Sequence, residues 1–370
     1  MSSKLEQYLA AAEPGVFQAQ LSASPVSKQP AMVTTSDSSS RTRVLITGGS
    51  GYLGQFLIAA LKQSHSIAYT YLHNAITAHP VNAEPFKVDL ATGEGLQEAV
   101  LQFKPQVVVN CAALSQPAAC ERDYEACRKL NVPSKLVEAL KQLQRKAGID
   151  ALLIHISTDQ VYDGSRPDWA ETDPTQPVNA YGRSKLEAEQ NLAAAYLHKH
   201  VVLRASLIYG PQPPLQAVGR PLFVQFVESQ LAQGIETSFF VDEFRSAVYV
   251  NDICEVVKLV ISKYSAAAAA AAAAPSDTGD ACHLAALPHS IYNMGGPERL
   301  GRHDMAMAVA QHCGHSSKAI KPANSADVQR GYSSPADISM KMEQLLADMP
   351  SIRLTPFAEG LAAIFPSKAA

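Results

Sequence analysis

The stretch RVLITGGSGYLGQFLIAAL, residues 43–61, decides the fold of this chain. Its apolar run at 44–46 is typical of a buried strand, and the apolar residues that follow the glycines recur at helical spacing. Gly48 allows the strand to turn tightly, Gly51 lets the backbone approach a pyrophosphate, and Gly54 lets helix and strand pack closely. The N-terminus of such a helix also offers free N–H groups to phosphates. The stretch therefore predicts a dinucleotide-binding corner.

The glycine spacing in this corner is G-x-x-G-x-x-G, with Thr47 in front of it. A glycine motif on its own is a weak signal, because an ordinary strand-to-helix turn has the same composition. The prediction therefore depends on the motifs that follow it in the chain.

The composition is that of a globular protein with enough apolar residues for a large core. The 370 residues are 47% hydrophobic and 18% charged. A formal net charge of −3 argues against nucleic acid or an anionic membrane surface as a partner. No uninterrupted apolar run is long enough to span a bilayer, so we expect no membrane segment.

The cysteines and the N-terminal segment bear on metal binding and location. The six cysteines form no C-x-x-C pair, and the histidines do not cluster at ligand spacing, so we expect no metal site. Reduced thiols are typical of a cytoplasmic protein. Residues 22–41 are rich in Ser, Thr and Pro, and we expect residues 1–41 to be a disordered tail. An organelle signal in this tail stays open, although Glu6 and Glu13 are unusual in such signals.

Strands and helices alternate from the first corner through Arg204, which predicts an α/β fold. This order is typical of a Rossmann-type, doubly wound parallel sheet, and we assign residues 42–210 to this dinucleotide-binding domain. Residues 211–366 have a mixed pattern and are expected to form a smaller C-terminal substrate-binding lobe, which includes a strand at 291–293. Nine alanines at 266–274 favour an extension of the preceding helix inside a mobile insertion, residues 265–289.

The end of the second predicted strand, 66–71, bears on the choice of cofactor. An acidic residue there binds the ribose of NAD, and a basic one accommodates the 2′-phosphate of NADP. The segment AYTYLHNAITAH has neither, which favours NADP(H) over NAD(H), with His73 or Asn74 near the phosphate; the alternative is a simple loop. Asp89 in VDL is a candidate contact of the adenine amino group, and the alternative is a helix cap.

Two further motifs carry candidate chemistry. HISTDQ ends a strand and places Thr158 at its carboxyl end, and YGRSK places Tyr181 and Lys185 four residues apart, on one face of a helix. A nearby ammonium group favours phenolate and lowers the pKa of a tyrosine. Tyr181 is then a proton donor to a carbonyl that accepts hydride, while Thr158 binds the substrate oxygen. A Y-x-x-x-K pair alone is common by chance, but the three motifs occur together and in order.

With these motifs the sequence resembles the extended short-chain dehydrogenase/reductase superfamily over residues 43–366. Within it, the chain looks most like dTDP-4-dehydrorhamnose reductase and its relative, the regulatory beta subunit of methionine adenosyltransferase. The shared stretches are TGGSGYLG, VDL, NCAAL, ISTDQVYDG, AYGRSK, LRASLIYG, YNMGGPERLGRHDMA, the Leu130-Asn131 pair and the segment around Asp337.

This resemblance implies roles for individual residues. It implies Thr158, Tyr181 and Lys185 as the catalytic residues, with Asn131 as a supporting polar residue near Lys185. The residues that it implies around the cofactor, besides Tyr181 and Lys185, are Gly48, Ser50, Gly51, Tyr52, Leu53, Gly54, Asp89, Leu90, Ala112, Ala113 and Leu114.

The sequence also departs from its relatives at two places. Dehydratases of the superfamily have Thr-Asp-Glu at the strand end, whereas Gln160 stands here, so simple reduction fits better than elimination. Relatives commonly have a basic residue where this chain has Ser334, which leaves diphosphate recognition open. Arg245 is a candidate replacement, and the alternative is an ion pair with Asp242 or Asp252.

The resemblance implies two functions. The first is NAD(P)H-dependent reduction of a 4-keto nucleotide sugar, as in dTDP-rhamnose biosynthesis. The alternative is a non-catalytic, NADP-binding regulatory subunit that docks on the catalytic subunit of methionine adenosyltransferase. The same motifs persist in both classes, so their presence does not separate the two. A homodimer is common in the superfamily and is expected here by analogy alone.

Overall fold

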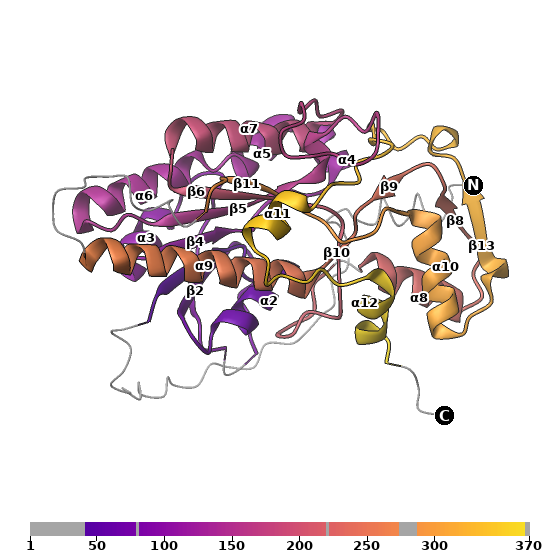
Figure 1. Cartoon of the computed structure of the whole chain (residues 1–370), viewed down its shortest axis with the longest axis horizontal. Coiled ribbons are helices and arrows are strands. Elements are labelled where there is room, and N and C mark those ends of the chain that lie inside the picture. The colour runs from indigo at the N-terminus through magenta and orange to yellow at the C-terminus, as the bar shows by residue number, and fades with distance from the viewer. Residues whose placement is uncertain (1–40, 79–80, 220–221, 274–286, 367–370) are drawn as a thin grey trace.

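The computed structural model describes residues 41–78, 81–219, 222–273 and 287–366. Its centre is a seven-stranded parallel sheet in the order β11-β6-β5-β4-β1-β2-β3 (Figure 1). The predicted doubly wound α/β fold is therefore confirmed. The strands of this sheet are β1 (Arg43–Thr47), β2 (Ser66–Tyr71), β3 (Glu84–Lys87), β4 (Val107–Asn110), β5 (Leu152–Thr158), β6 (His200–Ala205) and β11 (Ile291–Met294).

Helices cover both faces of the sheet because its strands are apolar on both sides. Along β1, Val44 and Ile46 pack into a core with α2 and α9, whereas Leu45 faces a second core with α3 and α6. The helices of this layer arrangement are α2 (Tyr52–Leu61), α3 (Leu96–Phe103), α4 (Pro117–Arg122), α5 (Tyr124–Asn131), α6 (Ser134–Ala147), α7 (Ala180–Ala195) and α9 (Val250–Ala273).

The C-terminal lobe lies beyond the carboxyl ends of the strands, on the right of Figure 1. A third apolar core holds α8, α10 and α12 together. Three two-stranded pairs, β7 with β10, β9 with β12 and β8 with β13, complete the lobe. Its elements are β7 (Ile208–Tyr209), α8 (Phe223–Ala232), β8 (Thr237–Phe240), β9 (Phe244–Arg245), β10 (Val248–Tyr249), β12 (Leu300–Gly301), α10 (Arg302–Cys313), β13 (Ile320–Ala323) and α12 (Phe357–Ile364). Helix α11 (Glu343–Asp348) packs on β11 of the central sheet instead.

One expectation about the second half of the chain needs correction. The strand at 291–293 was expected in the C-terminal lobe, but β11 pairs with β6 as the edge strand of the central sheet. Helix α9 likewise packs on α2. The reason is that a hydrophobic strand and helix from after residue 210 complete one edge of the parallel sheet, so the chain returns to the first domain.

The alanine run extends helix α9 as far as Ala273, as its helix propensity predicts. The expected mobile insertion lies mostly outside the described residues, as does the expected disordered tail at 1–40. No helix within the described ranges is both long enough and apolar enough to cross a membrane.

Candidate active site

The glycine corner has the close contacts that the sequence predicts. Gly48 has a φ of +63°, and a Cβ atom there would lie 2.9 Å from the Cα of Ala112. A Cβ at Gly54 would lie 2.5 Å from the carbonyl oxygen of Gly48, so the first turn of α2 touches the turn after β1. The N-cap residue Gly51 has no side chain to cap the helix. This backbone cradle, open at a helix N-terminus, fits a pyrophosphate.

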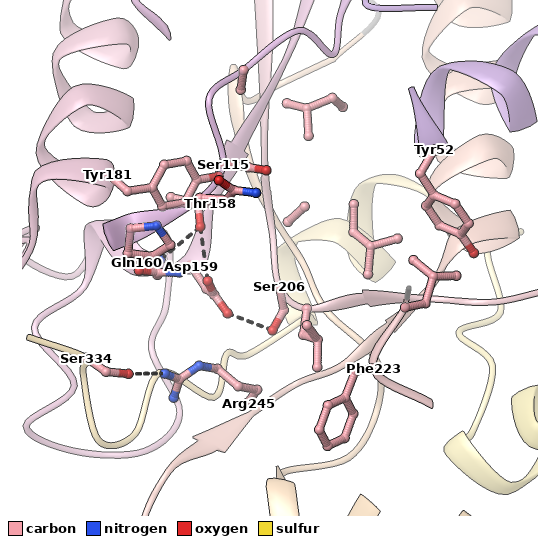
Figure 2. Close-up of a pocket in the computed structure, with 18 of the residues that line it drawn as sticks. Tyr52, Ser115, Thr158, Asp159, Gln160, Tyr181, Ser206, Phe223, Arg245 and Ser334 are labelled. Atoms are coloured by element: carbon pink, nitrogen blue, oxygen red, sulfur yellow. Dashed lines mark hydrogen bonds between the residues drawn. The ribbon is translucent and has the colours of Figure 1, made fainter. Parts of the chain in front are cut away.

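A cavity of about 530 Å³ begins at this corner and extends into the C-terminal lobe. Figure 2 shows Tyr52 of α2 at one side of the cavity, Tyr181 and Thr158 at the other, and Arg245 below them. The volume is in the range of ordinary small-molecule sites. The cavity therefore joins the carboxyl ends of the sheet strands to the lobe that was expected to bind substrate.

Thr158 and Tyr181 come from two elements, β5 and α7, that are connected by hydrogen bonds at the end of β5 and the start of α7. Thr158 is the last residue of β5, and Tyr181 lies in the first turn of α7. Asn179 caps α7 by accepting a hydrogen bond from the Gly182 N–H (2.9 Å) and donates to the side-chain oxygen of Gln160 (2.8 Å). The backbone N–H of Gln160 in turn donates to Thr158 Oγ1 (3.2 Å). Both candidate catalytic groups line the cavity.

Lys185 lies behind the cavity rather than in its lining. It is 1% exposed, and its Nζ atom lies 2.6 Å from the carbonyl oxygen of Ile156 and 3.1 Å from Nε2 of His155. Burial lowers the pKa of Lys185 to about 8, although the charge of Glu189 acts in the opposite direction. The lysine therefore has a pKa near neutral and two partners on strand β5.

The pKa of Tyr181 departs from the direction expected from its sequence neighbour. Burial raises this pKa, the charge of Asp159 raises it further, and only a hydrogen bond with Thr158 lowers it. The expected lowering by Lys185 is not found, because the ammonium group faces strand β5. Tyr181 therefore carries its proton at neutral pH, which is the form that a proton donor needs.

Asn131 holds a loop rather than the lysine. Its Oδ1 atom accepts a hydrogen bond from the Leu114 N–H (2.7 Å), and Nδ2 donates to the Leu114 carbonyl (3.1 Å) and to Ser184 Oγ (2.9 Å). Asn131 was expected beside Lys185, but it contacts the preceding residue on α7, Ser184. Asn131 fixes the segment that follows β4, at the edge of the cavity.

The residues expected around a cofactor fall into two groups. Those that line the cavity are Gly51, Tyr52, Leu53, Ala113 and Tyr181. The others shape the backbone around it or lie outside its lining, and they are Gly48, Ser50, Gly54, Asp89, Leu90, Ala112, Leu114 and Lys185.

Asp89 is engaged with its own turn. Its Oδ1 atom accepts hydrogen bonds from the N–H groups of Ala91 (2.8 Å) and Thr92 (3.3 Å). Burial raises the pKa of Asp89, but these backbone N–H groups lower it more, so the net change is downward. Asp89 therefore stabilises the turn at 89–92 and does not cap α3, whose N-cap residue is Gly95.

Three arginines line the end of the cavity in the C-terminal lobe, and we call Arg245, Arg302 and Arg330 the arginine cluster. Arg330 forms an ion pair with Glu243 (2.5 Å), and these two side chains are 8% and 4% exposed. The guanidinium group of Arg302 lies over the Phe223 ring, 4.8 Å from its centre. Asp159 also lines the cavity, and the charges of Arg245 and Arg302 act on it. Three guanidinium groups against two carboxylates still favour an anionic ligand at this end of the cavity.

Arg245 lines the cavity, but neither of the ion pairs expected for it is found among the described residues. Its Nη2 atom lies 3.9 Å from Glu243 and donates to Ser334 Oγ (3.2 Å) instead. Asp242 and Asp252 are not its partners because both carboxylates accept hydrogen bonds from other loops. Ser334, where relatives have a basic residue, therefore supports a guanidinium group supplied from β9.

Several cavity residues were missed from the sequence. Arg330 has no motif around it, and Phe223, Phe240 and Tyr332 come from separate segments of the lobe. The one available signal is YNMGGPERLGRHDMA, which contains Arg302 but gives no role to any of its residues. In the described part of the chain, no cluster of His, Cys, Asp or Glu has the makings of a metal site.

The comparisons with known proteins identify a family for this chain. Residues 42–369 match the family model described as the RmlD substrate binding domain. Methionine adenosyltransferase 2 subunit beta from Danio rerio is 27% identical over 323 residues, which covers 86% of this chain and 88% of the relative. dTDP-4-dehydrorhamnose reductase from Escherichia coli is 34% identical over 167 residues, which covers 45% of this chain and 51% of the relative.

Solved structures show the same fold. The structure of dTDP-4-dehydrorhamnose reductase from Bacillus anthracis in complex with NADP superposes with a TM-score of 0.69, at 20% identity, over 88% of this chain and 99% of that chain. The match of the family model spans nearly the whole described sheet and lobe. The chain therefore belongs to the RmlD substrate binding domain family, within the extended short-chain dehydrogenases/reductases.

Proposed function

We propose that this protein reduces the 4-keto group of a nucleotide sugar with NADPH. The observation that supports this most is the single cavity in which Thr158 and Tyr181 lie between the glycine corner and the arginine cluster. A nucleotide cofactor fits the first end of such a cavity, and a sugar diphosphate fits the second. The reacting carbonyl then lies in the middle, next to a phenol.

The chain's own residues have distinct roles in this proposal. Tyr181, which is protonated at neutral pH, donates a proton to the carbonyl oxygen. The Thr158 hydroxyl, which donates to Asp159 in this structure, turns to donate to that oxygen when the sugar binds. A bound reduced nicotinamide supplies the hydride. For Lys185 to orient the cofactor ribose, its ammonium group has to turn from His155 and the Ile156 carbonyl toward the cavity. Asn131 fixes the Leu114 segment. The arginine cluster holds the diphosphate.

Asp159 supports simple reduction in this scheme. It is 4% exposed, and its carboxylate accepts hydrogen bonds from Ser206 (2.7 Å) and Thr158 (3.1 Å). Burial raises its pKa, against the opposing charge of Arg245. Because Gln160 follows it, the strand end has one carboxylate instead of the pair that elimination chemistry uses. We infer that Asp159 positions Thr158.

The preference for NADPH is also a proposal. The end of β2 has no carboxylate, and Asp89, the nearest acidic candidate, is bonded to its own turn. A 2′-phosphate therefore meets no carboxylate at the end of β2 itself, and His73, whose charge also acts on Asp89, lies on the adjoining segment. Comparison of kcat/KM for NADPH and NADH tests this preference, and a value at least about tenfold higher for NADPH is expected.

The proposed reaction is tested by NADPH oxidation with dTDP-4-dehydrorhamnose as substrate. Turnover should be lost, by about 100-fold or more, in Tyr181→Phe, because the proton donor is removed. Tyr124→Phe is the matched control, since the Tyr124 hydroxyl contacts Glu187 outside the cavity. No oxidation by the wild-type protein, under conditions where NADPH binds, would reject the proposal.

The second candidate function is regulation of a methionine adenosyltransferase. The observation that favours it is the greater extent of similarity to the beta subunits, which covers 86% of this chain against 45% for the Escherichia coli reductase. The test is to mix the purified full chain with a methionine adenosyltransferase catalytic subunit. A stable complex, together with a change in the KM for methionine, would support this function, and separate elution would reject it.

A further inference from the structure

A chain of buried polar side chains leads from the glycine corner to Lys185. Thr47 Oγ1 lies 2.5 Å from Oδ1 of Asn110, whose Nδ2 lies 2.9 Å from Nδ1 of His155. The other ring nitrogen, Nε2, lies 3.1 Å from Lys185 Nζ. All four side chains are at most 4% exposed. The chain crosses three neighbouring strands, from the last residues of β1 and β4 to the middle of β5.

His155 is neutral in this chain. Burial lowers its pKa well below the usual value, and the nearby charge of Lys185 lowers it further. A neutral imidazole has one N–H donor and one nitrogen lone pair. The position of the imidazole proton therefore decides whether Nε2 is a donor or an acceptor in its 3.1 Å contact with Lys185 Nζ.

The same four side chains satisfy two hydrogen-bonding patterns. When Nδ1 carries the proton, it donates to the Asn110 oxygen, and Nε2 accepts from a charged Lys185 ammonium group. When Nε2 carries the proton, it donates to a neutral Lys185 amine, and Nδ1 accepts from the Asn110 NH₂ group. The two patterns differ by a turn of the Asn110 amide and by one proton, which leaves from Lys185; the imidazole carries one proton in both.

We propose that His155 is a positioning residue that keeps Lys185 hydrogen-bonded in both of its protonation states. This role rests on the proposed reductase function, because it describes how the buried lysine, four residues after Tyr181 on α7, releases and regains a proton. A buried amine without such a partner would be left unsatisfied in one of the two states, which costs free energy.

The other groups that face Lys185 and His155 fit this role. Glu189 lies on α7, Cys111 follows β4, Cys127 lies on α5, and His200 lies on β6. Burial lowers the pKa of Lys185 to about 8, so both protonation states are populated near neutral pH. The carbonyl of Ile156 accepts from Lys185 in either state and so does not discriminate between them.

The first experiment uses the wild-type full chain and needs no substrate. NMR spectra of the ¹⁵N-labelled histidine ring show which nitrogen carries the proton, with the His155 signals assigned by their loss in His155→Gln. As pH rises through the titration midpoint of Lys185, the proton of His155 should move from Nδ1 to Nε2. A proton that stays on one nitrogen on both sides of the midpoint overturns the proposal.

The second experiment follows Lys185 itself by ¹³C labelling of lysine, with its signal assigned by its loss in Lys185→Arg. His155→Leu should lower the midpoint by about one pH unit, because the ammonium form loses more from a missing acceptor than the amine loses from a missing donor. His155→Gln, whose amide offers both a donor and an acceptor, should restore the midpoint to within about 0.3 units. An unchanged midpoint in His155→Leu overturns the proposal.

His200→Leu is the matched control for loss of a buried imidazole, since His200 lies on β6 and bonds to the Tyr196 carbonyl at the C-terminal end of α7. It should leave the Lys185 midpoint within about 0.3 units. If the protein reduces the sugar, the basic limb of its kcat profile should move with the Lys185 midpoint in His155→Leu. If the protein does not reduce the sugar, the proposed function fails, but the two NMR titrations still decide the role of His155.

Discussion

The side-chain amide of Asn131 forms hydrogen bonds with both backbone groups of Leu114, accepting from its N–H at 2.7 Å and donating to its carbonyl at 3.1 Å. The segment after β4 is irregular, so the backbone groups of Leu114 have no partners on a neighbouring strand. The fully buried side chain of Asn131, on α5, forms hydrogen bonds with them instead. The edge of the cavity is thereby connected to the helix that precedes α6.

Replacement of Asn131 by alanine should loosen this segment. The Leu114 N–H and carbonyl lose their partners, and a free energy of unfolding about 2–3 kcal/mol lower is expected. The Kd for NADPH should rise by about tenfold, because the cavity edge no longer has one conformation. Denaturant unfolding and NADPH titration measure the two effects. The exposed Asn251→Ala variant should change neither, and equal losses in both variants would contradict this account.

Gly182 is required where α7 meets the end of β5. A Cβ atom at this position would lie 2.2 Å from the carbonyl oxygen of Gln160, which is backbone and does not move aside easily. We expect Gly182→Ala to lower the free energy of unfolding by about 2–4 kcal/mol and to displace Tyr181 from Thr158. Thermal unfolding and kcat measure both. Gly219→Ala, where no atom lies within 4 Å of the added Cβ, should be nearly neutral.

The arginine cluster should determine substrate affinity more than turnover. Arg330→Met removes one cation from the cavity and leaves Glu243 without its shortest ion pair. The KM for a nucleotide sugar should rise by about 10-fold to 100-fold, with a smaller change in kcat, since the diphosphate does not react. Arg353→Met breaks an exposed ion pair with Glu359 and serves as the control. A lower kcat with unchanged KM would contradict the assignment.

Lys185 should make the folded protein less stable at neutral pH than at mildly alkaline pH. Burial lowers its pKa from 10.5 to about 8, so the folded state binds the proton more weakly than the unfolded state does. The cost is fully present below pH 8 and is relieved as pH rises from about 8 to about 10.5, where the unfolded lysine still holds its proton.

Lys185→Met should therefore be more stable than the wild type by about 1–2 kcal/mol at pH 7, even though the lost hydrogen bonds offset part of the gain. The gain should disappear at about pH 9.5, below the titration of the unfolded tyrosines. Denaturant unfolding at the two pH values measures it. The half-exposed Lys258→Met variant should stay within about 0.5 kcal/mol of the wild type at both. A constant difference for Lys185→Met would show that its charge is not the cause.

Local signals in the sequence predict the fold and the centre of the site. The strand, glycine turn and helix at 43–61 lie in one short stretch, and Tyr181 and Lys185 lie on one helix, so neighbouring residues suffice to predict them. Arg330 and Glu243 meet from loops 87 residues apart, without periodicity or a motif. Likewise, β11 joins the sheet beside β6 only because the chain returns across it. Such long-range contacts leave no local pattern to interpret.

The direction of the Lys185 side chain could not be predicted from the sequence either. Its spacing from Tyr181 places both on one face of α7, but it does not say that Nζ bends toward His155 and the Ile156 carbonyl. The ammonium group therefore does not lower the pKa of Tyr181, and burial raises it. The identity of the residues was predictable, whereas their protonation depends on the surrounding core.

In the proposed reaction, Tyr181 gives a proton to a sugar carbonyl as hydride is delivered from NADPH. This reaction is tested by incubating the full chain with NADPH deuterated at C4 of the nicotinamide and with dTDP-4-dehydrorhamnose, and by following the sugar by NMR. We expect deuterium at C4 of the sugar with the wild-type protein and with Tyr124→Phe, and none above background with Tyr181→Phe. Absence of deuterium in the sugar with the wild-type protein, despite bound NADPH, would contradict the claim and favour the regulatory function.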